Sequence, residues 1–510
     1  MTANYTETTT EYVSWLTNNG VKISPKLKVE DNRYKDEGRC VVTTTDIQKD
    51  ELLFEIPRNV LLNCETSQLV KDIPAVLTEL ETFSGSEPLS WEPLILCLFY
   101  EMYILKDKSR WWPYFEVLPT LEDMNVLVLW SDEDLAALEP SYVLSCIGKE
   151  QVENMYQLLK RFIEASDHEQ LKSNLNKFSW DSFIRIGSLI MSYSFDVGKE
   201  IHNEGKEGES MNENDNMTNG DEDEDEDEED LEVEMIKSMV PLADTLNADT
   251  KKCNANLLHS KQTLRMIAIR DIPSGEQVYN TYGELSNSEL LRRYGYVEWD
   301  GSYYDCGEIS KSAIHKSLLQ LFPTSTETLE RLDAVIDENE KVLDLFDDDT
   351  IVEDTYIFES DGEIPFKFLF YIQLMALLLQ NSRIEKMGPI ALSKYMAPTI
   401  DKTSKILQEQ KVTRKALDVL NDSLDTRMKQ YEQKITDSGE DSLEPPSHEA
   451  STKEKRMRMV KMILLSEYKS LRKCSEVIRE EFGPLSDSDV LSEIKQSKEE
   501  KRPKKRAKTR

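Results

Sequence analysis

Paired cysteines, long apolar runs and a leader-like start are all missing from this sequence. Its seven cysteines lie far apart along 510 residues, with no C-x-x-C pair, which argues against a disulfide-rich secreted scaffold. No stretch reaches the roughly 18 apolar residues that a membrane helix needs. The start, MTANYTETTTEYVSWL, has no basic segment followed by an apolar one. We therefore expect an intracellular protein in a reducing compartment, without a membrane partner.

Positive charge is also scarce. The chain has 62 Lys and Arg against 97 Asp and Glu, which gives a formal net charge of -35. Such a negative field repels phosphate and attracts basic partners, so direct nucleic-acid binding is disfavoured and a basic protein partner is favoured. The alternative that the charge only maintains solubility stays open.

Two short β units, distant in the sequence, share one turn pattern. Residues 39–45 and 51–56 are rich in Val, Thr and Leu around the polar link DIQKD, which predicts two strands in a hairpin-like unit. The segment LRMIAIRDIPSGEQVYNTY repeats this order around a Pro-Ser-Gly turn. The spacing Asp-Ile-x-x-x-Glu begins at Asp46 and again at Asp271. The repeat favours one common sheet assembly, with chance agreement as the alternative.

Helical patterns interrupt and follow these β units. Residues 65–200 include stretches such as VENMYQLLKRFIEA, whose apolar residues recur at three- and four-residue spacing. From 199 to 233 this periodicity is lost, and DEDEDEDEED at 221–230 is wholly acidic, so we expect a disordered surface loop. After residue 300 the pattern is helical again, and residues 364–379 predict a buried helix.

The basic end of the chain contrasts with the rest. Seven of the last ten residues, KRPKKRAKTR, are Lys or Arg, and clusters of this kind are bound by nuclear import receptors. An ordinary solvated tail is the alternative. We expect the protein in the nucleus and partly in the cytoplasm.

Two segments combine residues that suit a ligand site. DEGRCVV places Gly38 between Glu37 and Arg39 at the start of a strand, where a glycine lets the backbone approach a ligand closely. VPLADTLNAD places Asp244 three residues before Asn247. A turn glycine, and a turn or helix cap, are the structural alternatives for these two segments.

A third segment, VYNTYGELSNSELLRRYGYVE, holds two Tyr-Gly pairs. Tyr282 precedes Gly283 at the end of a predicted strand, and Tyr294 precedes Gly295 after a predicted helix. An aromatic residue beside a glycine is usually a matter of core packing, so the order of the three segments carries the argument.

Together and in this order, the three segments resemble the SET-domain lysine methyltransferases of the class typified by the Rubisco large-subunit methyltransferase. SRWWPYFEVLP at 109–119 is similar to the family's S-x-W-x-P-Y segment, and SYSF at 192–195 to its cofactor-facing helix end. The resemblance implies an α+β fold, in which a helical insertion splits a β-rich SET core and an all-helical substrate-binding domain follows.

The resemblance also divides the chain. The implied parts are an N-terminal helical segment (1–21), a SET domain (22–298), a helical substrate-binding domain (299–485) and a basic disordered tail (486–510). Within the SET domain they are the first SET half (22–64), the helical insertion with its acidic loop (65–235) and the second SET half (236–298).

Site residues follow from the same resemblance. It implies S-adenosylmethionine as the cofactor, Tyr282 as the catalytic tyrosine, and no metal. The positions that match the family's cofactor contacts are Glu37, Gly38, Arg39, Tyr193, Asn247, Ala248 and Tyr282. The positions expected to contact the substrate are Trp111, Ser194, Asp244, Tyr279 and Tyr294.

One position departs from the family. Members commonly have Asn-His where this chain has Asn247-Ala248, so one imidazole contact with the cofactor is missing. A non-catalytic SET-like module that binds basic nuclear proteins is therefore the alternative function. Retention of Tyr282 and Asn247 favours the enzyme.

The expected reaction is methyl transfer to a lysine. A free lysine has a pKa of about 10.4 and must enter as the neutral amine, which burial beside a sulfonium favours.

Within the class, the pattern is similar to fungal enzymes that modify ribosomal proteins. This implies a basic large-subunit (60S) ribosomal protein as the substrate, and we expect the enzyme to be a monomer.

Overall fold

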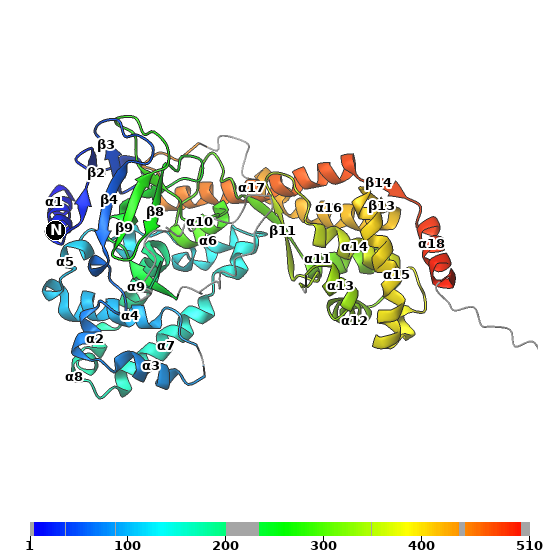
Figure 1. Cartoon of the computed structure of the whole chain (residues 1–510), viewed down its shortest axis with the longest axis horizontal. Helices are drawn as coiled ribbons and strands as arrows, with labels where there is room; N and C mark the ends of the chain where they lie inside the picture. The colour runs from blue at the N-terminus through cyan, green and yellow to red at the C-terminus, as the bar shows by residue number, and fades with distance from the viewer. Residues whose placement is uncertain are drawn as a thin grey trace, which may run out of the picture.

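The computed structural model describes residues 5–35, 37–86, 88–199, 234–347, 349–437 and 444–500. Figure 1 shows an elongated molecule, with an N-terminal lobe that holds most of the strands and a helical C-terminal lobe. The long helix α17 (Thr452–Glu481) runs from one lobe into the other. Each lobe has its own hydrophobic core, as a chain of this length requires. The predicted α+β class is confirmed.

The N-terminal lobe contains several small sheets. Its strands are β1 (Lys22–Ile23), β2 (Leu27–Asp31), β3 (Arg39–Thr43), β4 (Leu52–Pro57), β5 (Ser194–Gly198), β6 (Met235–Met239), β7 (Asn247–Ala248), β8 (Ala255–His259), β9 (Thr263–Ala268) and β10 (Tyr279–Asn280). The largest sheet has the order β1-β4-β9-β8, and the others pair β2 with β3, β5 with β6, and β7 with β10. Strand β4 is central, and its Leu53, Phe54 and Ile56 are buried.

The two repeated turns meet in space. Ile47 and Ile272 exchange backbone hydrogen bonds of 2.9 Å in both directions. The carboxylate of Asp46 accepts the backbone N–H of position 274, and that of Asp271 accepts the backbone N–H of position 49. The two β units are therefore joined, as the repeat predicted.

The predicted hairpin is wrong. Strands β3 and β4 form where expected, but β3 pairs with β2, whereas β4 pairs with β1 and β9. The reason is that the partners offered by other parts of the chain bury both strands, which a two-stranded hairpin alone cannot do.

Helices surround this core. They are α1 (Tyr5–Asn18), α2 (Gln68–Asp72), α3 (Val76–Ser84), α4 (Glu92–Phe99), α5 (Trp112–Phe115), α6 (Asp132–Ala136), α7 (Lys149–Ala165), α8 (Glu169–Lys172), α9 (Trp180–Tyr193) and α10 (Asn287–Tyr294). Helix α9 begins with a capping box between Ser179 and Ser182 and ends at Tyr193, so it delivers that residue to the edge of the sheets. The acidic stretch 200–233 lies outside the described residues.

The helical insertion belongs to both lobes. Leu127, Trp130 and Leu138 pack in the core of the C-terminal lobe, although they lie in the middle of the insertion. Arg456 of α17 also pairs with Asp134 of α6 at 2.7 Å. The insertion therefore fixes the C-terminal lobe against the N-terminal lobe.

The C-terminal lobe is built around one buried helix. Its helices are α11 (Lys311–Leu321), α12 (Thr326–Asp337), α13 (Glu340–Leu345), α14 (Phe366–Leu378), α15 (Pro389–Gln408), α16 (Arg414–Asp437), α17 and α18 (Asp487–Glu500). Every residue of α14 from Phe368 to Leu378 is buried, which explains its continuous apolar sequence. Its polar Gln373 is paired with Thr413. Throughout the described ranges, no helix is long and apolar enough to cross a membrane.

Two expectations for this lobe are corrected. It is not all helical, because β11 (Cys306–Ser310) pairs with β12 (Thr355–Glu359), and β13 (Lys411–Thr413) pairs with β14 (Gly483–Leu485). The tail does not begin at 486, because Val490 and Ile494 of α18 pack against the buried Leu377. Residues 501–510 lie outside the described residues.

Strand β11 packs closely against α17, and this contact gives a prediction. A Cβ atom on Gly307 would lie 2.5 Å from Leu471 Cγ and 2.6 Å from the backbone oxygen of Glu467. Gly307→Ala should therefore destabilise the protein by about 1–3 kcal/mol. Gly187→Ala is the matched control, since a Cβ there meets nothing within 4 Å and alanine favours the helix by about 1 kcal/mol. Thermal unfolding of both variants should show opposite shifts, and equal midpoints would contradict the close contact.

Candidate active site

The three predicted segments meet at the small sheets of the N-terminal lobe. Strand β7 pairs in parallel with β10, which sets Asn247 beside Tyr279. A backbone bridge joins Val42, just after the glycine turn, to Gln277. Residues far apart in the sequence therefore converge on one site.

The glycine turn offers an open backbone. Gly38 has a φ of +66°, and a Cβ there would meet nothing within 4 Å. The carboxylate of Glu37 accepts hydrogen bonds from the side-chain amides of Asn32 and Gln277. The turn thus combines a conformation that favours glycine with free space and a carboxylate.

Arg39 turns away from this space. Its guanidinium donates to the hydroxyls of Thr8 and Thr9 in α1 and to the backbone oxygen of Val117, and it lies 3.8 Å from the ring centre of Tyr5. Its side chain therefore fixes α1 against β3, and only its backbone is placed to contact a cofactor.

Gln277 connects the first two segments and was missed by the sequence analysis. Its amide nitrogen donates to Glu37 at 3.0 Å and to the Tyr279 hydroxyl at 2.8 Å. Its amide oxygen accepts from Asn247 at 2.7 Å. Residues two apart in a strand lie on the same face, so the spacing of Gln277 and Tyr279 could have indicated from the sequence that these side chains lie close together.

Tyr282 lies in a group of aromatic rings. Its hydroxyl donates to the backbone oxygen of Leu246 at 2.8 Å. The ring of Tyr294 stacks on it with centroids 4.4 Å apart, and Tyr296 meets it edge-on at 6.3 Å. Burial raises the pKa of the Tyr282 hydroxyl well above its ordinary value, so this group remains a proton donor.

Tyr296 is a second residue that the sequence analysis missed. Its hydroxyl contacts the backbone oxygen of Ala248 at 3.4 Å. The partly buried Tyr296 therefore lies against the backbone of Ala248. The Tyr-Gly-Tyr run at 294–296 was its only sequence signal.

Asp244 is a buried carboxyl group among tyrosines. It accepts a short hydrogen bond from the hydroxyl of Tyr114, and burial raises its pKa to about 7. Burial raises the pKa values of Tyr193 and Tyr282, and the charge of Asp244 adds to both shifts. Among the described residues no ion pair includes Asp244, and its carboxyl is held by the hydroxyls of Tyr114 and Thr245.

The surroundings of the four other expected substrate contacts differ from one another. Trp111 is buried, and its indole donates to the backbone oxygen of Val60 at 2.8 Å, so the core holds it and the expectation is wrong. The hydroxyl of Ser194 donates to the backbone oxygen of Ile190 at the end of α9. The hydroxyl of Tyr279 accepts a hydrogen bond from Gln277, and the ring of Tyr294 stacks on that of Tyr282.

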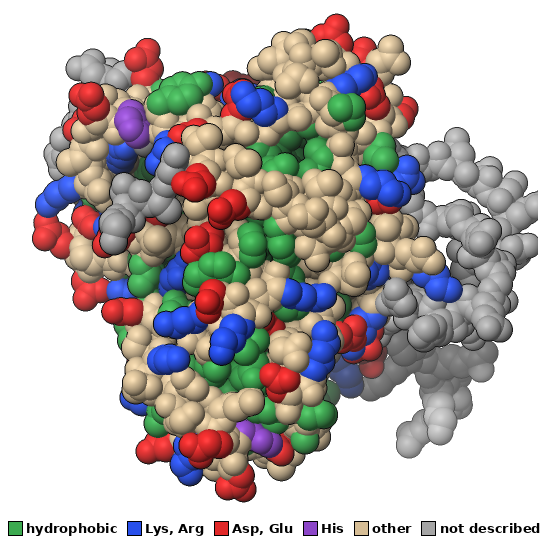
Figure 2. Space-filling model, turned by 90° about the vertical axis from the view of Figure 1, so that its left-hand side faces the viewer, with side chains coloured by type: hydrophobic (Ala, Val, Ile, Leu, Met, Phe, Trp, Pro, Cys, Tyr) green, Lys and Arg blue, Asp and Glu red, His purple; other side chains and the backbone are tan. Residues whose placement is uncertain are grey.

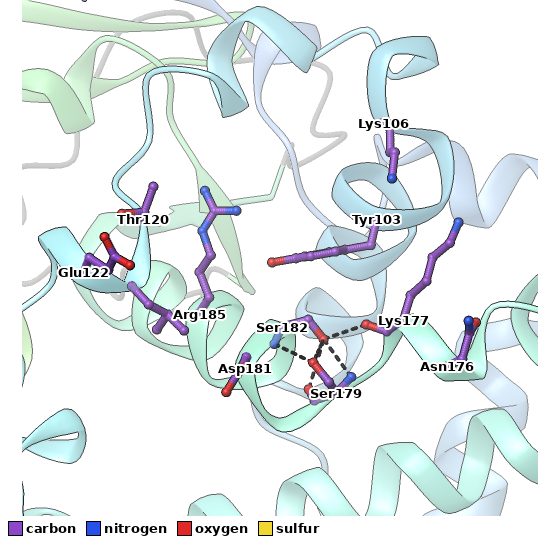
Figure 3. Close-up of a pocket in the computed structure, with 11 residues that line it drawn as sticks. Tyr103, Lys106, Thr120, Glu122, Asn176, Lys177, Ser179, Asp181, Ser182 and Arg185 are labelled. Carbon is purple, nitrogen blue, oxygen red and sulfur yellow. Dashed lines mark hydrogen bonds between the residues drawn. The ribbon is translucent and has the colours of Figure 1, made fainter. Parts of the chain in front are cut away.

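A separate cavity of about 620 Å³ lies between the end of the short π-helix η3 (Tyr100–Leu105) and the start of α9. Figure 3 shows Tyr103, Lys106, Lys177 and Arg185 around it, with the capping hydrogen bonds of α9 at its floor. None of the predicted site residues lines this cavity. Since it lacks the glycine turn and the stacked tyrosines, it does not contribute to the chemistry considered above.

Comparison with known proteins agrees with this geometry. The SET domain family model matches residues 38–283. The chain is 37% identical over 495 residues to ribosomal lysine N-methyltransferase 4 of Saccharomyces cerevisiae, covering 96% of both proteins. It is 28% identical to N-lysine methyltransferase SETD6 of Homo sapiens, covering 62% of this chain and 65% of that protein.

Solved structures show the same fold. The SET domain of LSMT bound to lysine and AdoHcy matches with a TM-score of 0.60 and 17% identity, covering 98% of this chain and 96% of that chain. Rubisco LSMT bound to AdoMet matches with a TM-score of 0.57 and 17% identity, covering 98% of this chain and 97% of that chain.

Proposed function

The chain belongs to the SET-domain lysine methyltransferases, which use S-adenosylmethionine, and on this premise we propose that it methylates a lysine of a large-subunit ribosomal protein. The family resemblance drawn from the sequence is thereby confirmed. The assignment of catalysis rests on the Tyr282 hydroxyl. Its ring is stacked with that of Tyr294, and the hydroxyl donates a hydrogen bond to the backbone oxygen of Leu246, the residue before Asn247.

The residues of the glycine turn fit this cofactor. The open backbone at Gly38 admits a ligand, and the Glu37 carboxylate and Asn247 amide suit its hydroxyl and ammonium groups. The buried Asp244, without an ion pair among the described residues, complements a positive charge. We assign cofactor binding to Glu37, Gly38 and Asn247, and to Tyr193 at the end of α9.

The protein's part in the reaction is to align and desolvate the lysine amine. When bound, S-adenosylmethionine supplies a methyl group already activated on a sulfonium. Burial beside a bound sulfonium disfavours an ammonium, because desolvation and the like charge both lower the pKa of the amine, so the lysine is held in its neutral, nucleophilic form. The Tyr282 hydroxyl is fixed by the Leu246 carbonyl, and this restricts where the amine can lie.

The ribosomal substrate is supported by two observations. One is the identity of 37% with the yeast ribosomal enzyme across 96% of both proteins. The other is the net charge of -35, which attracts a basic ribosomal protein before it is packed in RNA. On the face shown in Figure 2, acidic and basic side chains alternate with apolar patches. Such a surface suits a protein partner better than the phosphates of a nucleic acid.

Tyr282→Phe should reduce the turnover number by about 100-fold or more, since a positioned donor contributes on that order. Affinity for S-adenosylmethionine should change little, because the stacked ring is kept. Steady-state methylation assays and calorimetric cofactor titration measure the two effects. Tyr142→Phe, at a side chain that is 43% exposed, is the control. Near-normal turnover of the Tyr282 variant would place the active site elsewhere.

Free large-subunit ribosomal proteins should be methylated faster than intact 60S subunits. The reason is that the substrate lysine and its basic surroundings are accessible only before assembly. Labelled methyl transfer to both preparations, followed by mass spectrometry, measures the rates and identifies the lysine. The rate on the free protein should fall as salt is raised. Faster labelling of intact subunits would overturn the proposed order, and labelling of no ribosomal protein would overturn the substrate.

We also propose that the protein is at least partly nuclear, because its end carries seven Lys or Arg in ten residues. Truncation after Glu500 should shift a fluorescent fusion toward the cytoplasm and leave methylation in vitro unchanged. A full-length variant with these seven residues changed to Gln is the matched control, because it removes the charge but keeps the length of the chain. It should shift toward the cytoplasm as the truncated fusion does. A truncated fusion that stays nuclear would show that the tail is not the signal.

A further inference from the structure

We propose that Gln277 is a positioning residue that sets the orientation of Asn247 in the cofactor site. The inference rests on the proposed function. It concerns a side chain of the second half of the SET domain that hydrogen-bonds both to Glu37 of the first half and to Asn247.

The amide of Gln277 has one possible orientation. Its nitrogen donates to two acceptors, the Glu37 carboxylate at 3.0 Å and the Tyr279 hydroxyl at 2.8 Å. Its oxygen accepts from the amide nitrogen of Asn247 at 2.7 Å. A flipped amide would direct an oxygen at a carboxylate, which cannot donate. The carboxylate therefore determines which way the Gln277 amide lies.

The orientation of Gln277 then determines that of Asn247. The Gln277 amide oxygen can accept a hydrogen bond but cannot donate one. The amide nitrogen of Asn247 therefore faces it, and the amide oxygen of Asn247 faces away. No described group donates to this oxygen. It remains as an acceptor for a ligand, and the ammonium of an amino-acid group is the donor that suits it.

The backbone holds this arrangement in place. Tyr279 pairs with Asn247 in the parallel contact of β10 and β7, and Gln277 is bridged to Val42. The Glu37 oxygen that accepts from Gln277, Oε2, also accepts a hydrogen bond from the side-chain amide of Asn32. The polar chain Asn32–Glu37–Gln277–Asn247 thus spans the site, and Gln277 is the member whose removal separates Asn247 from the rest.

Gln277→Met tests the inference, because methionine keeps the length of the side chain and removes its donors and acceptor. The dissociation constant for S-adenosylmethionine, measured by calorimetry, should rise about tenfold, as the loss of one oriented hydrogen bond predicts. Turnover at saturating cofactor should change by less than about threefold, since Tyr282 is untouched. Gln262→Met, at an exposed glutamine, is the matched control and should bind normally.

A double-mutant cycle with Asn247→Ala separates positioning from general destabilisation. If Gln277 acts through Asn247, the double variant should bind no more weakly than the Asn247 variant alone. If the two effects multiply, or if Gln277→Met binds like the wild type, the inference is overturned. Should Gln277→Met unfold, Tyr279→Phe removes one anchor of the amide with little change in volume and should weaken binding in the same direction.

The wild-type titration keeps the two proposals distinguishable. A wild-type protein that binds no S-adenosylmethionine would contradict the proposed function itself. A wild-type protein that binds it, together with a Gln277 variant that binds it equally well, would contradict only the role of Gln277.

Discussion

Backbone pairing between the two halves of the SET region is the interaction on which the site depends. Ile47 pairs with Ile272, Val42 with Gln277, and β4 with β9, so segments more than 200 residues apart form one assembly. Each of these hydrogen bonds is short-range and directional. The glycine turn, Asn247 and Tyr282 are therefore held at fixed positions although a long insertion separates them in the chain.

Polar groups inside this assembly are matched to one another. Glu37 and Asn247 share the Gln277 amide, and Asp244 lies among tyrosine hydroxyls. Buried polar groups without partners are costly, and a carboxyl whose pKa is raised to about 7 by burial is stabilised in its charged form by a cation. The site thus combines a buried carboxyl group with an aromatic surface.

The junction of the lobes uses the same principle. Glu467 of α17 is buried and accepts hydrogen bonds from the hydroxyls of Ser141 at 2.7 Å and Tyr431 at 2.9 Å. These two partners come from the insertion and from α16, so one carboxyl group connects three parts of the chain. The C-terminal lobe therefore has a defined position relative to the active site, which a substrate-binding role requires.

Local sequence determined the helices and the identity of the site segments. The continuous apolar run of α14 and the periodic pattern of α7 depend on burial that repeats along the chain itself, and the glycine at position 38 is required by its own φ. The tertiary structure decided the rest. The partners of β3 and β4, the burial of Trp111, the place of Tyr279 and the role of Gln277 all depend on contacts with distant segments. The physical reason is that a strand or a polar side chain can be satisfied by many partners, and only the folded chain determines which one it meets.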